Sequence, residues 1–144
     1  MMAPLAVLPA ANLLEIERRQ AAGVTRPNPE WMAAARRATA RLRATTVRAR
    51  GAGHCVYIAL LEDRRRACRW GLYVGQTSCD PDTRFDQHKT GYKASRHVNR
   101  FGVGLLPELV EHLNPMRGWE ALELEAALAD ELRRAGVPWV EGGH

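Results

Sequence analysis

The sequence predicts a protein of the α/β class, more narrowly an α+β fold, in which helices flank a small, mostly antiparallel, three-stranded sheet. Two runs rich in β-branched, aliphatic and aromatic residues, at 55–62 and 70–75, are separated by the short polar segment 63–69. This pattern is typical of two strands joined as an antiparallel hairpin. Residues 120–134 place apolar side chains at helical spacing and end in two arginines before Gly136, which predicts an amphipathic helix.

The N-terminal third is predicted to be helical and basic. Asn28-Pro29-Glu30 fits the start of a helix that runs to about Arg48, because Asn caps, Pro suits the first turn and an acid suits the positive end of the dipole. Gly51-Ala52-Gly53 then breaks the pattern. We therefore expect an N-terminal helical, Arg-rich extension at 1–50 and a main domain at 54–144.

Local signals predict the remaining elements. Asp80-Pro81-Asp82-Thr83 fits a helix start, with Phe85 directed inward and Gly91 as the C-terminal stop. Four weaker segments complete the prediction: a short helix at 13–20, a helical turn at 95–101, an edge strand within 105–113 and a short last strand at 137–140.

Composition is ordinary for a globular protein of 144 residues, with 46% hydrophobic and 26% charged residues. No apolar run approaches the roughly 18 residues needed to cross a bilayer. The segment from Met1 to Leu14 lacks a preceding basic region and contains Pro4 and Pro9, so it is interpreted as a leader to the first helix and not as a signal peptide. We expect a cytoplasmic protein without a membrane partner.

The cysteines argue against a disulfide framework, because there are three of them and no CxxC pair. A zinc site stays open as a minor alternative, although the close ligand pairs of known zinc sites are missing. Its candidate ligands are His54, Cys55, Cys68, Cys79 and His88.

Positive charge is unevenly distributed. The net charge is +5, and residues 1–50 hold nine Arg against three Glu. A second basic cluster lies near 84–100. Such surfaces attract polyanions, above all nucleic acid, although charge alone is equally compatible with a solvated Arg-rich helix.

A group of chemically active side chains follows the predicted hairpin. Val56-Tyr57 and Tyr73-Val74-Gly75 lie on the two strands, and Arg84 and His88 share one face of the next helix. These two half-motifs, with the Arg and His that follow, resemble the GIY-YIG nuclease family over roughly residues 54–141. The resemblance implies that two tyrosines, an Arg and a Glu surround one Mg²⁺ or Mn²⁺ and cut a DNA phosphodiester bond.

The resemblance also implies a role for each residue. Tyr57, assisted by His88, activates water, and Tyr73 positions water or phosphate. Arg84 suits the charge of phosphoryl transfer, because a guanidinium stays charged and binds two oxygens. Two departures are present: Cys55 replaces the Gly of the first half-motif, and no Asn occurs in or near the last strand, where Trp139 or His144 is available instead.

Four glutamates of the helix at 120–134 are candidate metal ligands: Glu120, Glu123, Glu125 and Glu131. Helical geometry directs Glu123 away from the apolar face but leaves Glu125 and Glu131 on its two borders. The resemblance selects Glu125, since the family's Glu lies in a Leu-Glu-x-x-Leu stretch that matches 124–128.

A basic stretch next to this group is predicted to contact nucleic acid: Lys89, Lys93, Arg96 and Arg100, with Tyr92 between them. The Arg-rich helix at 33–50 is expected to extend it. The leading hypothesis is a metal-dependent DNA endonuclease. The alternative is a nucleic-acid-binding module on the same fold with little or no catalysis.

Overall fold

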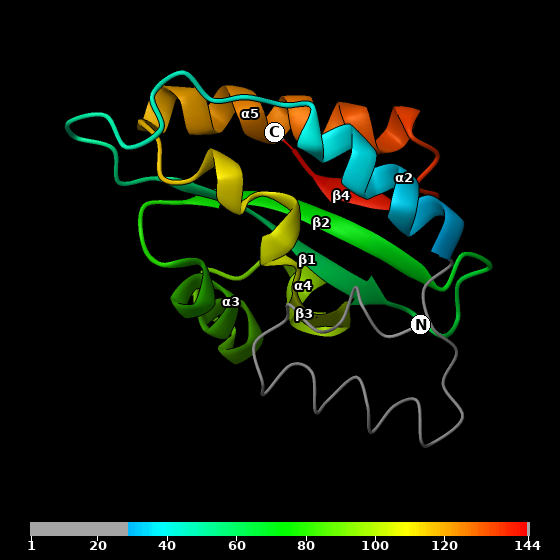
Figure 1. Ribbon diagram of the computed structural model, residues 1–144. Coiled ribbons are helices and arrows are strands. Elements are labelled where there is room, and N and C mark those ends of the chain that lie inside the picture. Colours follow the sequence, from blue (N-terminus) through cyan, green and yellow to red (C-terminus); the bar gives the residue numbers. More distant parts are fainter. Residues whose placement is uncertain (1–28, 144) are drawn as a thin grey trace.

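The computed structural model describes residues 29–143 and has an α+β fold, with one four-stranded mixed sheet and helices on both of its faces (Figure 1). The helix predicted at 13–20 and the capping role predicted for Asn28 lie outside the described residues. No helix in the described part of the chain has the length and apolar character needed to cross a membrane.

The sheet has the order β3-β1-β2-β4. The strands are β1 (Cys55–Glu62), β2 (Trp70–Thr77), β3 (Gly102–Leu105) and β4 (Val140–Gly142). The predicted hairpin is confirmed, because β1 and β2 pair antiparallel along their whole length. The prediction of a mostly antiparallel three-stranded sheet was wrong in detail, since β4 adds a fourth strand parallel to β2.

Two strands lie elsewhere than predicted. The edge strand expected within 105–113 is β3, which ends at Leu105, and two 3-10 turns follow it, η2 (Pro107–Leu109) and η3 (Glu111–Leu113). Pro107 has no N–H to donate to a neighbouring strand, so strand pairing stops before it. The last strand was expected at 137–140 but begins at Val140.

The helices are α2 (Pro29–Ala40), α3 (Pro81–Thr90), α4 (Arg96–Phe101) and α5 (Gly118–Arg134). The signals predicted for α3 are confirmed: the Asp80 side chain accepts from the N–H of Thr83, and Gly91 takes a left-handed conformation at the C-terminal end. Ser95 caps α4 in the same way by accepting from the N–H of Val98.

The sheet separates two helical layers. Alternate side chains of β1 and β2, such as Ile58 and Leu72, enter the larger core with α2 and α5. Tyr57, Tyr73 and Phe85 belong to a second cluster on the opposite face, where α3 and α4 pack (Figure 1). The arginines of α2 are therefore separated by the sheet from the tyrosines, and do not extend the basic stretch at 89–100.

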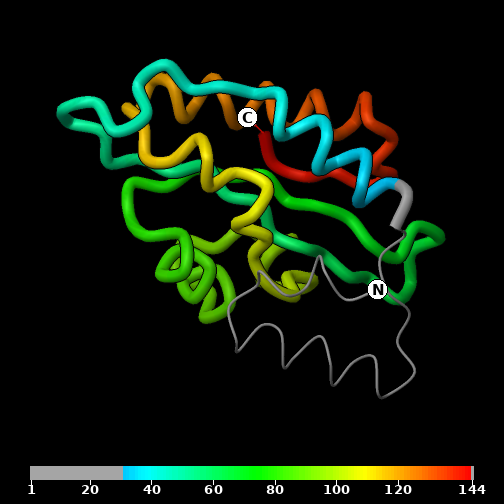
Figure 2. Tube along the Cα trace, in the orientation of Figure 1, coloured from blue at the N-terminus to red at the C-terminus, as the bar shows by residue number. Residues whose placement is uncertain are grey.

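The described part of the N-terminal extension packs on the main domain. Met32 and Ala35 are buried members of the larger core, and Leu42 packs against it. Figure 2 shows the chain after α2 following α5 before it enters β1. Segments 29–50 and 54–143 thus share one core.

Helix α2 ends at Ala40, so the prediction that it continues to about Arg48 was wrong. Beyond that end, a carboxylate from a distant segment holds the chain. Glu120 on α5 accepts from the N–H and the hydroxyl of both Thr45 and Thr46. These two amides are therefore bound to a carboxylate and are not available to a helix that continues to Arg48.

We expect Glu120→Gln to lower the free energy of unfolding by about 1–3 kcal/mol at neutral pH, since it removes the charge that receives four hydrogen bonds. These bonds, that of the Thr46 hydroxyl foremost, lower the pKa of Glu120 from 4.5 to about 2. As pH falls, the unfolded chain binds the proton first. The stabilising effect is therefore complete above about pH 4.5 and is lost as pH falls to about 2.

Urea unfolding of the wild type and the variant at several pH values measures this effect. The difference between the two should shrink across the acidic range, and Glu123→Gln, an exposed position of the same helix, should change little. A difference that stays constant down to about pH 2 would contradict the assigned pKa.

Candidate active site

The two tyrosines lie together on the face covered by α3 and α4. Their ring centroids are 6.1 Å apart, and the His88 ring lies 6.1 Å from Tyr57 and 5.9 Å from Tyr73. Tyr57 pairs with Gly75 across the hairpin. A Cβ at Gly75 would overlap the Tyr57 ring, which explains the glycine of the second half-motif. The sequence signals thus meet at one point of the sheet.

His88 is buried, with 2% of its surface exposed, and both ring nitrogens have partners. The backbone N–H of Ser95 donates to Nδ1 at 2.8 Å, and Nε2 lies 2.7 Å from the Tyr57 hydroxyl. An amide can only donate, so Nδ1 carries no proton and a neutral ring must carry its proton on Nε2. His88 therefore donates to Tyr57.

The same ring stays neutral at physiological pH. Burial, and after it the nearby charge of Arg84, lower the pKa of His88 from 6.5 to about 4. His88 is consequently unable to accept the Tyr57 proton, and its contribution is to orient the phenol and to stabilise negative charge on its oxygen.

Tyr57 and Tyr73 also affect each other's pKa. Burial is the main cause that raises the pKa of both phenols. Hydrogen bonding with Ser95 and with Tyr57 holds the pKa of Tyr73 down, whereas hydrogen bonding with Tyr73 raises the pKa of Tyr57 further. These interactions therefore favour ionisation of Tyr73 over ionisation of Tyr57.

Arg84 lies on the first turn of α3 and connects it to the loop 91–95. Its Nη1 donates to the Gln87 side chain at 3.0 Å and to the carbonyl of Tyr92 at 3.3 Å, while Nη2 donates to the carbonyl of Lys93 at 2.8 Å. The positive charge lowers the pKa of both phenols. A guanidinium has five N–H donors, so within the described part of the chain two of them remain for a ligand.

Glu125 is the glutamate of α5 that acts on the phenols. It is 7% exposed, and its charge raises the pKa of both Tyr57 and Tyr73. The other candidates are engaged elsewhere or exposed. Glu120 binds the 45–46 segment, Glu131 pairs with Arg41 and Arg134, and Glu123 is exposed to solvent.

The predicted basic stretch divides into two parts. Lys89 donates to the carbonyls of Val98, Asn99 and Gly102, so it fixes the end of α4. The other three cations are exposed and have no such hydrogen bonds to carbonyls among the described residues: Lys93, Arg96 and Arg100. These three remain predicted contacts for a phosphate backbone.

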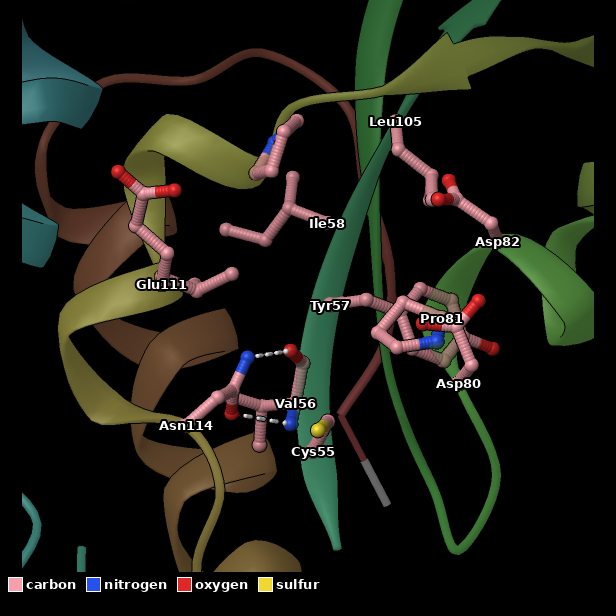
Figure 3. Close-up of a pocket in the computed structure, with 12 residues that line it drawn as sticks. Cys55, Val56, Tyr57, Ile58, Asp80, Pro81, Asp82, Leu105, Glu111 and Asn114 are labelled. Atoms are coloured by element: carbon pink, nitrogen blue, oxygen red, sulfur yellow. Dashed lines mark hydrogen bonds between the residues drawn. The ribbon is translucent and has the colours of Figure 1, made fainter. Parts of the chain in front are cut away.

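A cavity of about 250 Å³ adjoins Tyr57 at the start of β1 (Figure 3). Asn114 closes one side by accepting from the N–H of Val56 at 2.9 Å and donating to its carbonyl at 2.8 Å, as a neighbouring strand would. Carboxylates of Asp80, Asp82 and Glu111 line the rim. This surface is therefore acidic, in contrast to the positive charge of Arg84 on α3.

Sequence reasoning missed Ser95 and Asn114, which both support the tyrosines. Ser95 was included only as the start of a helical turn, although its position before an apolar turn is a capping signal. Nothing in the local sequence marks Asn114, because its role depends on a strand 58 residues away.

Glu125 remains the predicted metal ligand. Within residues 29–143 no three His, Cys, Asp or Glu side chains are grouped as metal ligands. The three cysteines are free and half-buried, which gives no support to the zinc alternative. One carboxylate is the minimum protein donor set for Mg²⁺, which keeps several waters and takes the rest of its ligands from substrate phosphate.

Comparison with protein-family models, curated proteins and solved structures gives no match for this chain. The GIY-YIG likeness therefore stays a prediction that depends on the residues named above.

We expect ¹⁵N NMR of the imidazole rings to show His88 with a protonated Nε2, a bare Nδ1 and a titration midpoint near 4, not 6.5. The unfolded chain protonates His88 first, so this residue reduces stability as pH falls from 6.5 to about 4. His88→Asn identifies the signal by its loss. Tyr57→Phe should keep the tautomer, because the Ser95 amide remains. A proton on Nδ1 would overturn the assigned directions.

Proposed function

We propose that this chain is a metal-dependent endonuclease that hydrolyses DNA phosphodiester bonds in the manner of the GIY-YIG family. The observation that carries the proposal is the contact cluster of Tyr57, Tyr73 and His88, together with two charged groups that act on its phenols. The charged groups are Arg84 on α3 and Glu125 on α5, whose charges shift the pKa of both phenols in opposite directions. Two phenols, a neutral imidazole, a guanidinium and a carboxylate suit attack of water on a phosphodiester.

The effects of hydrogen bonding on the two phenols support a specific division of roles. Hydrogen bonding with Ser95 and Tyr57 lowers the pKa of Tyr73, whereas hydrogen bonding with Tyr73 raises the pKa of Tyr57, so negative charge is better stabilised on Tyr73. Tyr73, as a phenolate, takes the proton of the attacking water. Tyr57 stabilises this phenolate, and His88 in turn is hydrogen-bonded to Tyr57. This assignment transfers to Tyr73 the base role that the sequence suggested for Tyr57.

Arg84 and Glu125 complete the proposed site. The two remaining N–H donors of Arg84 bind non-bridging phosphate oxygens, whose negative charge develops during the reaction. Glu125 would hold Mg²⁺ or Mn²⁺, which when bound supplies Lewis-acid polarisation of the phosphate and stabilises the leaving oxygen. Without a metal, the same residues support the alternative, a nucleic-acid-binding module. This alternative is favoured because a single carboxylate is a small donor set for a metal, and the described residues contain no group of three potential metal ligands.

Incubation of the protein with single- and double-stranded DNA in Mg²⁺, Mn²⁺ or chelator tests the activity. We expect metal-dependent cleavage that Arg84→Ala lowers by about 10²–10³-fold, because charge stabilisation of the transition state is lost. Glu125→Gln should abolish the metal-dependent cleavage, while Glu123→Gln on the same helix should cleave like the wild type.

Cleavage that persists in chelator, or that survives both Arg84→Ala and Glu125→Gln, excludes the proposed mechanism. Salt-sensitive binding without cleavage in either metal establishes the binding module instead. Circular dichroism of each variant separates loss of chemistry from loss of fold.

Removing each phenol separately tests the division of roles. We expect Tyr73→Phe to lower the cleavage rate by about 10²–10⁴-fold, as for loss of a general base. Tyr57→Phe removes only a hydrogen bond that lowers the pKa of Tyr73, so the rate should fall less, and the ascending limb of the pH profile, which reports deprotonation of Tyr73, should move to higher pH. A larger loss of cleavage rate in Tyr57→Phe than in Tyr73→Phe would instead assign the base role to Tyr57.

A further inference from the structure

Tyr92 is an exposed aromatic residue held next to Arg84. Its side chain is 57% exposed, whereas Tyr57 and Phe85 nearby are buried. The backbone around it is fixed from both sides. The Tyr92 N–H donates to the carbonyl of Gln87 at 2.9 Å, and its carbonyl accepts from Arg84 at 3.3 Å. The ring is therefore presented to solvent from a firmly held position.

A cation accompanies the ring. The Nζ of Lys93 lies 5.7 Å from the Tyr92 ring centroid, and Lys93 has a left-handed backbone with φ of 44°. This conformation is uncommon for a residue with a side chain, and Arg84 holds it by donating to the Lys93 carbonyl. The Tyr92 ring, the Lys93 ammonium and the Arg84 guanidinium are thus held next to one another. This combination is typical of a platform on which a nucleobase stacks.

We propose that Tyr92 stacks on an unpaired nucleobase adjacent to the phosphate bound by Arg84, so that the substrate is a single-stranded or locally unpaired nucleic acid. This inference rests on the proposed function. In an intact duplex each base face is covered by its neighbours and only the edges are open in the grooves. Stacking on Tyr92 therefore requires a base that has left the helix or was never paired.

Charge distribution around the site agrees with one strand and not with two. Exposed cations lie on one flank, at Lys93, Arg96 and Arg100. These cations follow the C-terminal end of α3, whereas at its N-terminal end Asp80 and Asp82 border the cavity next to Tyr57 (Figure 3). A duplex brings two phosphate backbones to a protein surface, and the second would meet this acidic border. A single strand needs only the basic flank.

Fluorescence anisotropy in chelator, where no cleavage occurs, tests the inference with one labelled oligonucleotide as a single strand and as a blunt duplex. We expect the wild type to bind the single strand more tightly. Tyr92→Ala should weaken single-strand binding by roughly 5- to 100-fold and leave duplex binding unchanged. Tyr92→Phe should bind like the wild type, because stacking needs only the ring face. Trp119→Ala, an equally exposed aromatic on α5, is the matched control.

The outcomes separate this inference from the proposed function. If Tyr92→Ala leaves single-strand binding unchanged, or weakens single-strand and duplex binding equally, the stacking role is overturned, while metal-dependent cleavage by the wild type keeps the nuclease proposal. If the wild type binds neither form and cleaves neither form, both proposals fail together.

Discussion

The hydrogen bond from the Ser95 amide to His88 Nδ1 is the constraint on which the candidate site depends. It comes from the backbone at the start of α4, so side-chain substitution does not remove it. It determines the tautomer of a buried imidazole and thereby the direction of the bond to Tyr57. Ser95 also caps α4 and bonds Tyr73 with its hydroxyl. Ser95 therefore both starts helix α4 and, through His88 and Tyr73, affects the hydrogen bonding of both phenols.

The electrostatics of this cluster have two causes. The two phenols and the imidazole are buried, and one cation and one anion act on the phenols. Burial favours the uncharged forms of Tyr57, Tyr73 and His88. Arg84 and Glu125 then act on both phenols with opposite sign. Phenol ionisation at neutral pH therefore requires additional positive charge, which is the physical reason for coupling the proposed chemistry to a divalent cation.

Much of the fold was predictable where local signals decide it. The hairpin, the caps of α3 and the length of α5 follow from residue patterns within short windows. Contacts between distant residues decided the rest. Glu120 binds Thr45 and Thr46 within a segment that was predicted to be helical, and β4 forms where it pairs with Leu72–Val74. The same distinction holds for the site, where Arg84 and His88 share a predicted helix face but Asn114 has no local signal.

The two departures from the family pattern have local structural explanations. Burial, followed by the charge of Asp80, raises the pKa of Cys55, so its thiol stays neutral and adds no charge next to Tyr57. The last strand offers no amide to Tyr73. Although Glu141 pairs with Tyr73 across the sheet, its carboxylate binds the Trp139 indole at 3.0 Å and lies 3.5 Å from His97. Tyr73 instead has a hydrogen-bonding partner in Ser95, the residue that caps α4, and this interaction lowers the pKa of Tyr73.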